Sequence, residues 1–166
     1  MYKNSHIALI VAANDIDVIG SGLDIPWPRI KEDMKRFREL TMGKPIPMGR
    51  KTWDSLDANF KPLPKRTNIV ITKQEDFVAE GAIVVHSLEA AFDAAPEPVI
   101  CVIGGGIIYE AALPYADTVE LTRVHNQNPG DVFFKPLDPK VWTLDADKIV
   151  KGDGYTFETY HRTTSS

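Results

Sequence analysis

The chain has 166 residues, of which 43% are hydrophobic and 25% are charged, and its formal net charge is −4. This size and balance predict one globular domain with a substantial core. The acidic balance gives no electrostatic footprint for nucleic acid or an anionic membrane, and no apolar run approaches the ~20 residues of a membrane span.

In chain order, the first predicted element is a strand over residues 7–13, because its nearly continuous apolar run is typical of a strand buried on both faces. Residues 14–30 contain two glycines and two prolines and predict a long irregular loop. Loops of this length inside a compact domain are usually functional or disordered. Residues 31–42 predict a helix with an apolar stripe through Met34 and Phe37.

The rest of the chain alternates short apolar runs with helical patterns, which predicts an α/β fold. We expect a single domain with a large mixed, mainly parallel eight-stranded sheet, about four flanking helices and a C-terminal antiparallel hairpin. The further elements are a segment at 44–48, a helix opening at Gly49, strands at 68–72, 83–85, 99–103 and 118–124, a helix capped by Ser87, a helix at 107–112, and a closing pair at 141–149 and 154–162.

Cysteine and histidine usage points to a cytoplasmic protein without a metal site. The single cysteine, Cys101, cannot form an internal disulfide, which suits a reducing compartment, and its apolar surroundings predict a small buried side chain. The four histidines lie far apart, without metal-ligand spacing. The polar start of the chain predicts no secretory signal. Since no hydrophobic stripe is left over for a partner, we expect a monomer.

The first segment that could carry chemistry centres on Asp33, which lies six residues beyond Trp27, with the apolar positions Ile30 before it and Met34 and Phe37 after it. A carboxylate held against apolar walls needs a hydrogen-bond partner or a shifted pKa, as in a ligand pocket. The same pattern fits an acid in water at a helix start, where the helix dipole favours negative charge. Glu32 is a competing acid next door.

Two further segments join a strand to a helix through glycine. Residues 48–53 (Met-Gly-Arg-Lys-Thr-Trp) place Arg50 and Lys51 at a helix N-terminus, where free N–H groups suit a phosphate. Residues 102–109 place three glycines between a buried strand and a helix, as in turns that approach a pyrophosphate. Each alone is equally an ordinary junction or tight turn, and the second lacks the G-x-G-x-x-G pattern of a Rossmann site.

Taken together and in this order, these motifs closely resemble dihydrofolate reductase of the bacterial type. The resemblance runs from about residue 7 to residue 136. The positions that carry it are Ile19-Gly20, Pro26-Trp27, Asp33, Met48 to Trp53, Pro62-Leu63-Pro64, Arg66, Ile103 to Gly106, Tyr109, Thr122 and Gly130-Asp131 followed by Phe133-Phe134.

The resemblance implies NADPH-dependent reduction of 7,8-dihydrofolate to 5,6,7,8-tetrahydrofolate. A hydride would pass to the pterin ring with protonation at N5, supplying one-carbon metabolism, and antifolates would be inhibitors. The family pattern also implies that residues 44–103 form an adenosine-binding subdomain within the single domain 1–166. Hydride transfer requires no nucleophile or metal in the protein, because the cofactor carries the difficult step.

For the substrate, the resemblance implies that Asp33 binds the amidine edge of the pterin and supports protonation, with Thr122 completing the contact. Arg66 would pair with the glutamate tail, where a guanidinium suits bidentate carboxylate binding. Main-chain oxygens of Ile10 and Ile103 would hold the ring amino group. The remaining substrate-binding positions are Met34, Phe37, Leu56, Lys61, Leu63 and Tyr109.

For the cofactor, the resemblance implies contacts from the 20–28 loop, which would close over the site, and from both glycine segments. Arg50 and Lys73 would meet the adenosine 2′-phosphate, and the Gly104–Gly105 bond is expected to be cis. The cofactor-binding positions are Ala12, Ile19, Gly20, Ser21, Leu23, Arg50, Lys51, Thr52, Thr72, Lys73, His86, Ile103, Gly104, Gly105, Gly106, Ile107, Ile108 and Tyr109.

Two departures from the family pattern carry expectations of their own. Pro47 stands where a branched apolar residue is usual, and proline removes a strand donor, so the strand should be an edge, a bulge or shortened. Ile107 stands where bacterial relatives often carry arginine, which leaves Arg50 and Lys73 with more of the preference for NADPH.

Two alternatives stay open. One is another pterin or pyrimidine reductase of the same fold, such as the riboflavin-pathway reductase domain. The other is a non-catalytic nucleotide-binding module that uses only the two glycine-rich turns, which would leave Asp33 and Arg66 without a role.

Overall fold

The computed structural model describes residues 1–20 and 25–163, and the predicted α/β class is confirmed in them. The described helices are α1 (Lys31–Thr41), α2 (Arg50–Ser55), α3 (Leu88–Ala94) and α4 (Gly106–Ala112), with 3-10 turns η1 (Ala58–Phe60), η2 (Leu113–Tyr115) and η3 (Ala146–Lys148). The described strands are β1 (His6–Asn14), β2 (Val18–Gly20), β3 (Pro45–Gly49), β4 (Thr67–Ile71), β5 (Ile83–Val85), β6 (Val99–Val102), β7 (Thr118–Val124), β8 (Val132–Phe133), β9 (Trp142–Leu144), β10 (Val150–Gly152) and β11 (Tyr155–Arg162). None of these helices has the length and apolar character of a membrane span.

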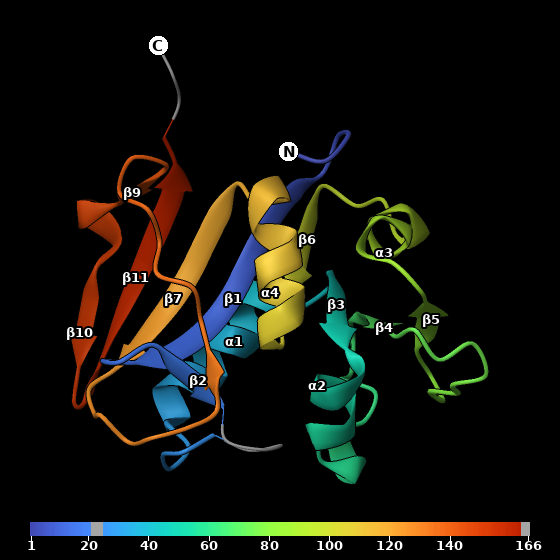
Figure 1. Cartoon of the computed structure of the whole chain (residues 1–166), viewed down its shortest axis with the longest axis horizontal. Coiled ribbons are helices and arrows are strands. Elements are labelled where there is room, and N and C mark those ends of the chain that lie inside the picture. The colour runs from blue at the N-terminus through green and yellow to red at the C-terminus, as the bar shows by residue number, and fades with distance from the viewer. Residues whose placement is uncertain (21–24, 164–166) are drawn as a thin grey trace.

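The main sheet is mixed, with parallel strands in its centre (Figure 1). Its order is β10-β11-β7-β1-β6, and β1 runs parallel to both β6 and β7. The antiparallel part is at the C-terminal end of the chain, where β11 pairs with β7, β9 and β10. A second, parallel sheet has the order β3-β4-β5.

The two sheets meet between β3 and β6, at a seam that contains Pro47. Ile103 N donates to Pro47 O at 3.0 Å, and Gly49 N donates to Gly104 O at 2.8 Å. Pro47 has no N–H to return a bond. The strands therefore form a six-stranded and a three-stranded sheet that adjoin at this seam, rather than the single eight-stranded sheet that was predicted. Pro47 lies on β3, the edge strand of the three-stranded sheet, and β3 keeps five residues, most of which are buried.

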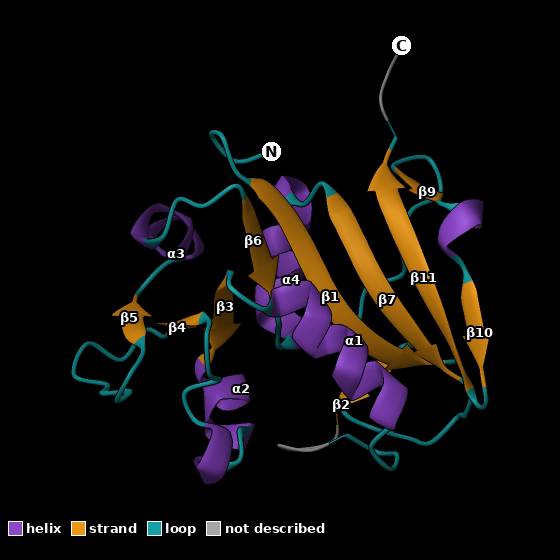
Figure 2. Ribbon diagram, turned by 180° about the vertical axis from the view of Figure 1, so that it is seen from behind, coloured by secondary structure: helices purple, strands orange, loops and turns teal. Residues whose placement is uncertain are grey.

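Side chains of β1 alternate between two hydrophobic clusters, one on each face of the sheet. Ile7, Leu9 and Val11 pack with residues of α3 and α4. Ala8 and Ile10 face the other way and belong to the cluster against which α1 and α2 residues pack. Figure 2 shows α1 lying across β1 and β7, and α4 lies on the opposite face. A strand with both faces covered explains the continuous apolar run.

Most predicted boundaries agree with the structure within one or two residues, and two segments differ. The predicted loop at 14–30 contains β2, which pairs with β8 through only a few residues, too short for a periodic signal. The first strand of the predicted closing pair is interrupted by η3 and forms β9 and β10, which both pair with β11. The Ser87 cap is confirmed, since Ala90 N donates to Ser87 Oγ at 3.0 Å.

Candidate active site

The first turn of α1 brings Asp33 against β7. Thr122 Oγ1 donates to Asp33 Oδ1 at 2.6 Å. Thr122 is buried and pairs with Ala12 of β1, so the sheet fixes its hydroxyl on the face covered by α1. Burial raises the pKa of Asp33, while the bond from Thr122 and the charge of Arg36 oppose that rise. Glu32, the competing acid, is exposed. Asp33 therefore has the surroundings of a ligand-binding carboxylate.

A second polar contact ties α4 to β1 behind this carboxylate. The buried Tyr109 hydroxyl donates to Ile10 O at 2.6 Å. Burial, and then the charge of Asp33, raise the pKa of Tyr109, so the phenol stays a hydrogen-bond donor at neutral pH. A carbonyl oxygen has two lone pairs, and Ile10 O therefore keeps the capacity to accept from a ligand. Ile103 lies beyond the end of β6, beside β1.

Apolar side chains line the same face of the sheet. Phe37, Leu56 and Leu63 are partly buried and pack against the cluster that contains Ile10 and Ile103. Met34 is 49% exposed, so the structure leaves one apolar side chain of α1 available to a ligand. The predicted walls of the substrate pocket thus come together from three separate segments.

Arg66 precedes β4 and is oriented by two bonds. Its Nε donates to Pro64 O at 2.9 Å and its Nη1 donates to Thr41 Oγ1 at 3.1 Å. Burial and the nearby Arg38 lower its pKa, yet a guanidinium stays charged near neutrality. No carboxylate within residues 1–20 and 25–163 pairs with it. Arg66 is therefore a fixed cation with donors to spare for an anion.

Lys61 is a second predicted substrate-binding cation and is less constrained than Arg66. Its Nζ is 4.9 Å from the centroid of the Trp53 ring. The half-buried aliphatic stem and the ring contact hold the ammonium near the end of α2. This position agrees with an auxiliary role beside a carboxylate ligand.

The parallel strands β3, β4 and β5 end at one edge, where the predicted phosphate residues meet. Gly49 is level with Ile71, and Ile71 with Val85, so Arg50, Thr72 and His86 follow side by side. The His86 ring and Thr72 are hydrogen-bonded, since Nδ1 lies 2.7 Å from the Thr72 carbonyl oxygen. This edge gathers polar groups from three strands, as the carboxyl ends of parallel strands do in ligand sites.

The cations of this edge are exposed rather than buried. Lys51 and Lys73 both lie in water. Arg50 is half-buried and forms an ion pair with Asp54, Nη1 to Oδ2, at 2.7 Å. Exposed cations contribute long-range attraction and little fixed geometry. The geometry must therefore come from the backbone.

Two helix N-termini supply that backbone geometry. The N-caps of α2 and α4 are Gly49 and Gly105, and neither start has a side-chain cap. A Cβ added to Gly105 would lie 3.5 Å from Thr52 Oγ1, so the turn and the first residues of α2 face each other closely. The Gly104–Gly105 peptide is cis, as expected. Uncapped N–H groups, a hydroxyl and nearby cations fit the phosphates of a dinucleotide.

The β2–β8 pair closes the other side of this turn. A Cβ added to Gly106 would lie 2.8 Å from Val132 Cγ1 and 3.8 Å from Ile19 Cδ1. Gly20 O accepts from Asp131 N at 3.1 Å. Ile19 and Gly20 are therefore on the described border of the site, next to the start of α4, whereas Ala12 lies in β1 opposite Thr122. Ser21 and Leu23, and with them residues 21–24 of the 20–28 loop that was expected to close, lie outside the described residues.

The helix after the glycines presents two isoleucines differently. Ile107 is 83% exposed, whereas Ile108 is partly buried and its Cγ1 would lie 3.1 Å from a Cβ on Gly49. Ile108 thus packs the start of α4 against the start of α2. Ile107 adds no charge to the half-buried Arg50 and the exposed Lys73.

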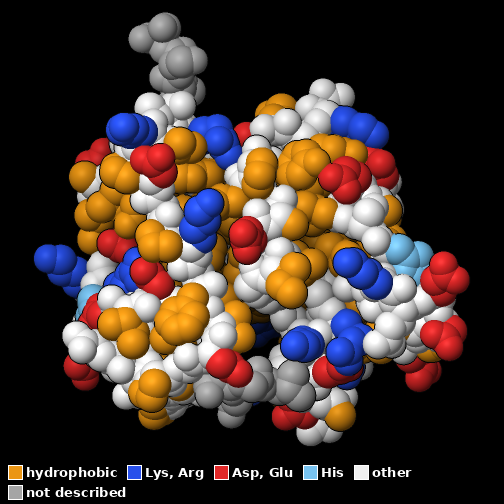
Figure 3. All heavy atoms as spheres, viewed as in Figure 1, with side chains coloured by type: hydrophobic (Ala, Val, Ile, Leu, Met, Phe, Trp, Pro, Cys, Tyr) orange, Lys and Arg blue, Asp and Glu red, His pale blue; other side chains and the backbone are white. Residues whose placement is uncertain are grey.

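Figure 3 shows a hollow in the lower middle of this face, between the β1–β7–β11 part and the α2–β4–β5 part. Lys and Arg side chains gather on the α2 side of the hollow, whereas hydrophobic side chains surround its upper end. A cationic flank and an apolar border at the upper end suit a ligand with phosphates at one end and a ring at the other.

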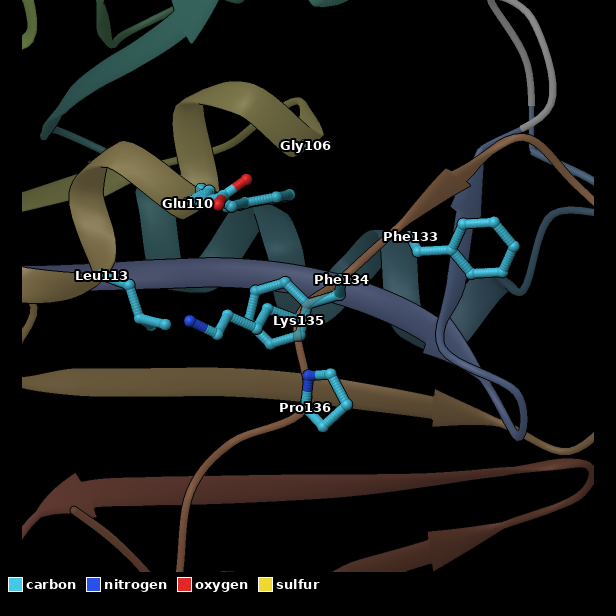
Figure 4. A pocket seen from close by; sticks show the side chains of 8 residues that line it. Gly106, Glu110, Leu113, Phe133, Phe134, Lys135 and Pro136 are labelled. Atoms are coloured by element: carbon cyan, nitrogen blue, oxygen red, sulfur yellow. The ribbon is translucent and has the colours of Figure 1, made fainter.

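A pocket on the outer side of α4 shares Gly106 and Tyr109 with the predicted cofactor positions but does not include Asp33 (Figure 4). Its walls come from α4, the start of η2, the end of β8 and the segment that follows β8. Phe134 lies edge-on to the Tyr109 ring, with centroids 5.6 Å apart, and supports the tyrosine from behind. Of the predicted substrate residues, the pocket includes Tyr109 alone.

The sequence interpretation missed two features of the site. The first is the β2–β8 pair, which borders the glycine turn. The second is an ion pair between Arg36 and Glu120, which ties α1 to β7 beside Asp33. The second had a signal: Glu120 is an acid two residues before Thr122 in a strand, so it points to the same face.

Comparisons with known proteins agree with this geometry. The family model for dihydrofolate reductase matches residues 6–162. A dihydrofolate reductase of Mycobacterium tuberculosis is 46% identical, covering 94% of this chain and 98% of that protein. One of Bacillus subtilis is 36% identical and covers 96% of each. A solved dihydrofolate reductase from Enterococcus faecalis, complexed with NADP(H) and RAB-propyl, superposes with a TM-score of 0.87 at 33% identity, covering 99% of this chain and 100% of that one.

Proposed function

The chain belongs to the dihydrofolate reductase family, and from this premise we propose that it reduces 7,8-dihydrofolate to 5,6,7,8-tetrahydrofolate with NADPH. The reaction adds a hydride to C6 and a proton to N5 of the pterin. The observation that carries the proposal is the half-buried Asp33 carboxylate held by Thr122 at 2.6 Å, beside apolar walls and a glycine turn.

For the substrate, we assign the binding of the amidine edge to Asp33. Its free carboxylate oxygen accepts from the ring N–H groups, while Thr122 holds the other oxygen. The raised pKa moves proton exchange at this carboxyl toward neutral pH, which supports protonation at N5. Ile10 and Ile103 offer carbonyl oxygens to the ring amino group, and Arg66 binds the glutamate tail as a bidentate cation.

For the cofactor, the uncapped starts of α2 and α4 hold the pyrophosphate, together with the Thr52 hydroxyl. Arg50 and Lys73 attract the 2′-phosphate. When bound, NADPH supplies the hydride. The protein contributes alignment of two rings and exclusion of water, which lower the barrier without a nucleophile.

We also assign residues 44–103 as the adenosine-binding part of the single domain, because β3, β4, β5, α2 and α3 all fall in this range. We expect a cytoplasmic monomer that supplies one-carbon metabolism, binds antifolates and has no nucleic-acid partner. Size-exclusion chromatography with light scattering checks the monomer, and a dimer mass contradicts it.

The first test follows the loss of NADPH absorbance with dihydrofolate for wild type and Asp33→Asn. We expect the variant to lose about 10²–10⁴-fold in kcat, the range for removing a general acid. The matched control is Glu32→Gln, which neutralises the exposed acid next door and leaves the rate unchanged. Loss in the control alone moves the proton role to Glu32.

The activity of the wild-type protein distinguishes an enzyme from a non-catalytic nucleotide-binding module. A folded wild type that oxidises neither NADPH nor NADH in the presence of dihydrofolate contradicts the enzyme and leaves a nucleotide-binding module. Thermal unfolding then separates the two readings further, because a module gains stability from NADPH but gains nothing more from a folate-like compound.

A further inference from the structure

A second polar contact joins α1 to β7 one helical turn beyond Asp33. Arg36 forms an ion pair with Glu120, and their side chains are only 17% and 14% exposed. On the helix, Asp33 and Arg36 are three residues apart and share a face. On the strand, Glu120 and Thr122 are two residues apart and also share a face. The helix therefore meets the strand through two parallel polar contacts.

The ion pair is built into the neighbouring strand as well. Thr159 of β11 lies opposite Glu120 and donates from Oγ1 to Glu120 Oε2 at 2.7 Å. Phe157 lies opposite Thr122, and the Arg36 guanidinium carbon is 4.7 Å from the centroid of its ring. Both charges have fixed partners, so this pair has one defined geometry rather than the many of a surface ion pair.

We propose that Arg36 and Glu120 form a positioning pair for Asp33: they fix the first two turns of α1 over β7 and set the electrostatic field at the carboxylate. The proposal rests on the function assigned to Asp33 above. Arg36 favours the charged carboxylate and Glu120 opposes it, so the two residues act in opposite directions on the same group. A pair that only fastened α1 to β7, without acting on Asp33, would leave the titration of Asp33 unchanged when either charge is neutralised.

Within the described residues, two tyrosines also face Asp33, and its exposed neighbour Glu32 acts on one of them, Tyr155. Tyr109 comes from α4 and Tyr155 from β11, and the charge of Asp33 contributes to raising the pKa of both. They stay uncharged over the range in which a carboxylate titrates. Among the described residues, Arg36 is the charged group whose field acts on Asp33, and Glu120 is the acid that holds Arg36 in place.

The experiment is a carbon-13 NMR titration of the Asp33 carboxyl, assigned by the signal lost in Asp33→Asn. We expect Arg36→Met to raise the pKa of Asp33 by about one unit and Glu120→Gln to lower it by about half a unit. Arg36→Lys keeps the charge and restores most of the wild-type value. The matched control is Lys35→Met, which removes an exposed cation from the same helix and leaves the titration unchanged.

Opposite shifts in the two variants support the proposal, and the pH profile of kcat then moves in the same two directions. Shifts of one sign, or none in either variant, overturn it. If Arg36→Met does not fold, a comparison of Glu120→Gln with Arg36→Lys still tests the proposal. We then expect the pKa of Asp33 to fall in Glu120→Gln and to stay near the wild-type value in Arg36→Lys. The titration does not depend on catalytic turnover, so the two proposals can fail separately. If the pKa shifts are opposite but the protein does not oxidise NADPH, the positioning pair is supported and the proposed function is contradicted.

Discussion

The two sides of the site are built by different physical means. On the α1 side, polar groups are partly buried and satisfied within the protein, as in the pairs Thr122–Asp33 and Arg36–Glu120. At the edge of β3, β4 and β5, Lys51 and Lys73 lie in water and the helices begin without side-chain caps. The first arrangement fixes a charge where chemistry needs it, whereas the second leaves donors free for a ligand.

This difference predicts different consequences of substitution. On the α1 side, a change should alter the rate and its pH dependence, because the charge of Asp33 is set by its neighbours. At the edge where β3, β4 and β5 end, which we call the phosphate edge, a substitution should alter the affinity for the cofactor and the salt dependence of that affinity, because exposed charges act at a distance.

The broadest expected effect comes from Gly104→Ala, which should lower both stability and cofactor affinity because this turn lies between both sides. Gly104 has φ of +118°, and an added Cβ would lie 3.1 Å from Tyr109 Oη and 3.2 Å from its ring carbons. We expect the free energy of unfolding to fall by about 1–3 kcal/mol from the strained backbone, and KM for NADPH to rise about tenfold through loss of the turn geometry. Urea unfolding and steady-state kinetics measure the two effects.

The control for this glycine is Gly154→Ala. Gly154 also has a positive φ, +81°, but an added Cβ would meet nothing within 4 Å. It should lose stability and leave KM for NADPH unchanged. Equal kinetic effects in both variants would mean that the contact with Tyr109 is irrelevant to the cofactor site.

Thr122→Val sharpens the α1 side. The substitution keeps the shape of the side chain and removes the bond to Asp33, and hydrogen bonds to charged groups contribute about 1.5–3 kcal/mol. That bond lowers the pKa of Asp33, so its loss raises the pKa and moves the pH profile of kcat to higher pH. We expect kcat to fall about tenfold or more. The control is Thr118→Val on the same strand as Thr122. It loses a hydrogen bond with His6 of β1 and should keep the wild-type pH profile.

Asp33→Asn tests how much the half-buried carboxylate charge lowers the free energy of unfolding. Folding raises the pKa of Asp33, so its contribution is fully present below the ordinary Asp pKa of about 3.9 and is lost as the pH rises through the folded value. The variant should therefore be more stable than wild type at pH 7, and the gain should vanish near pH 4. Urea midpoints at both pH values check this, with the exposed Glu32→Gln as control. An unchanged midpoint at pH 7 would show that Asp33 is not destabilised by its surroundings.

The smallest effect is expected from Lys73→Gln on the phosphate edge. An exposed cation contributes a few tenths of a kcal/mol to 1 kcal/mol, so KM for NADPH should rise about two- to fivefold at low salt and less at high salt. KM for NADH should not change, since that cofactor lacks the 2′-phosphate. Lys151→Gln on β10 removes an exposed charge far along the sheet and serves as control. An equal rise for both cofactors would contradict the assignment of Lys73.

The sequence was most informative where local chemistry decides the structure. The apolar run at 7–13 predicts a strand with two covered faces, and the structure confirms it. The Ser87 cap and the strand at 118–124 agree as well. Cys101 is buried, and burial raises its pKa to about 11, which fits an inert thiol. No comparable pattern marks β2 and β8, because strands of two or three residues show no periodicity.

The choice between Glu32 and Asp33 shows what the sequence could not decide. Helical spacing alone leaves a thin margin between neighbouring acids, because both lie in the first turn. Only the packing of α1 against β7 places Thr122 beside one of them and leaves the other in water. In the same way, Pro47 predicts a missing donor, but only the order of the strands shows that the loss falls at the seam between two sheets.

By itself, the sequence determined the α/β class, the order of most elements and the residue types available to bind phosphate and a pterin, because propensity, period and caps act over a few neighbouring residues. The tertiary structure alone decided which of those residues meet. Asp33 and Thr122 are 89 positions apart and Arg36 and Glu120 are 84 apart, so no local rule can pair them. Their contacts follow from the register of β7 on β1 and from the position of α1 over both strands.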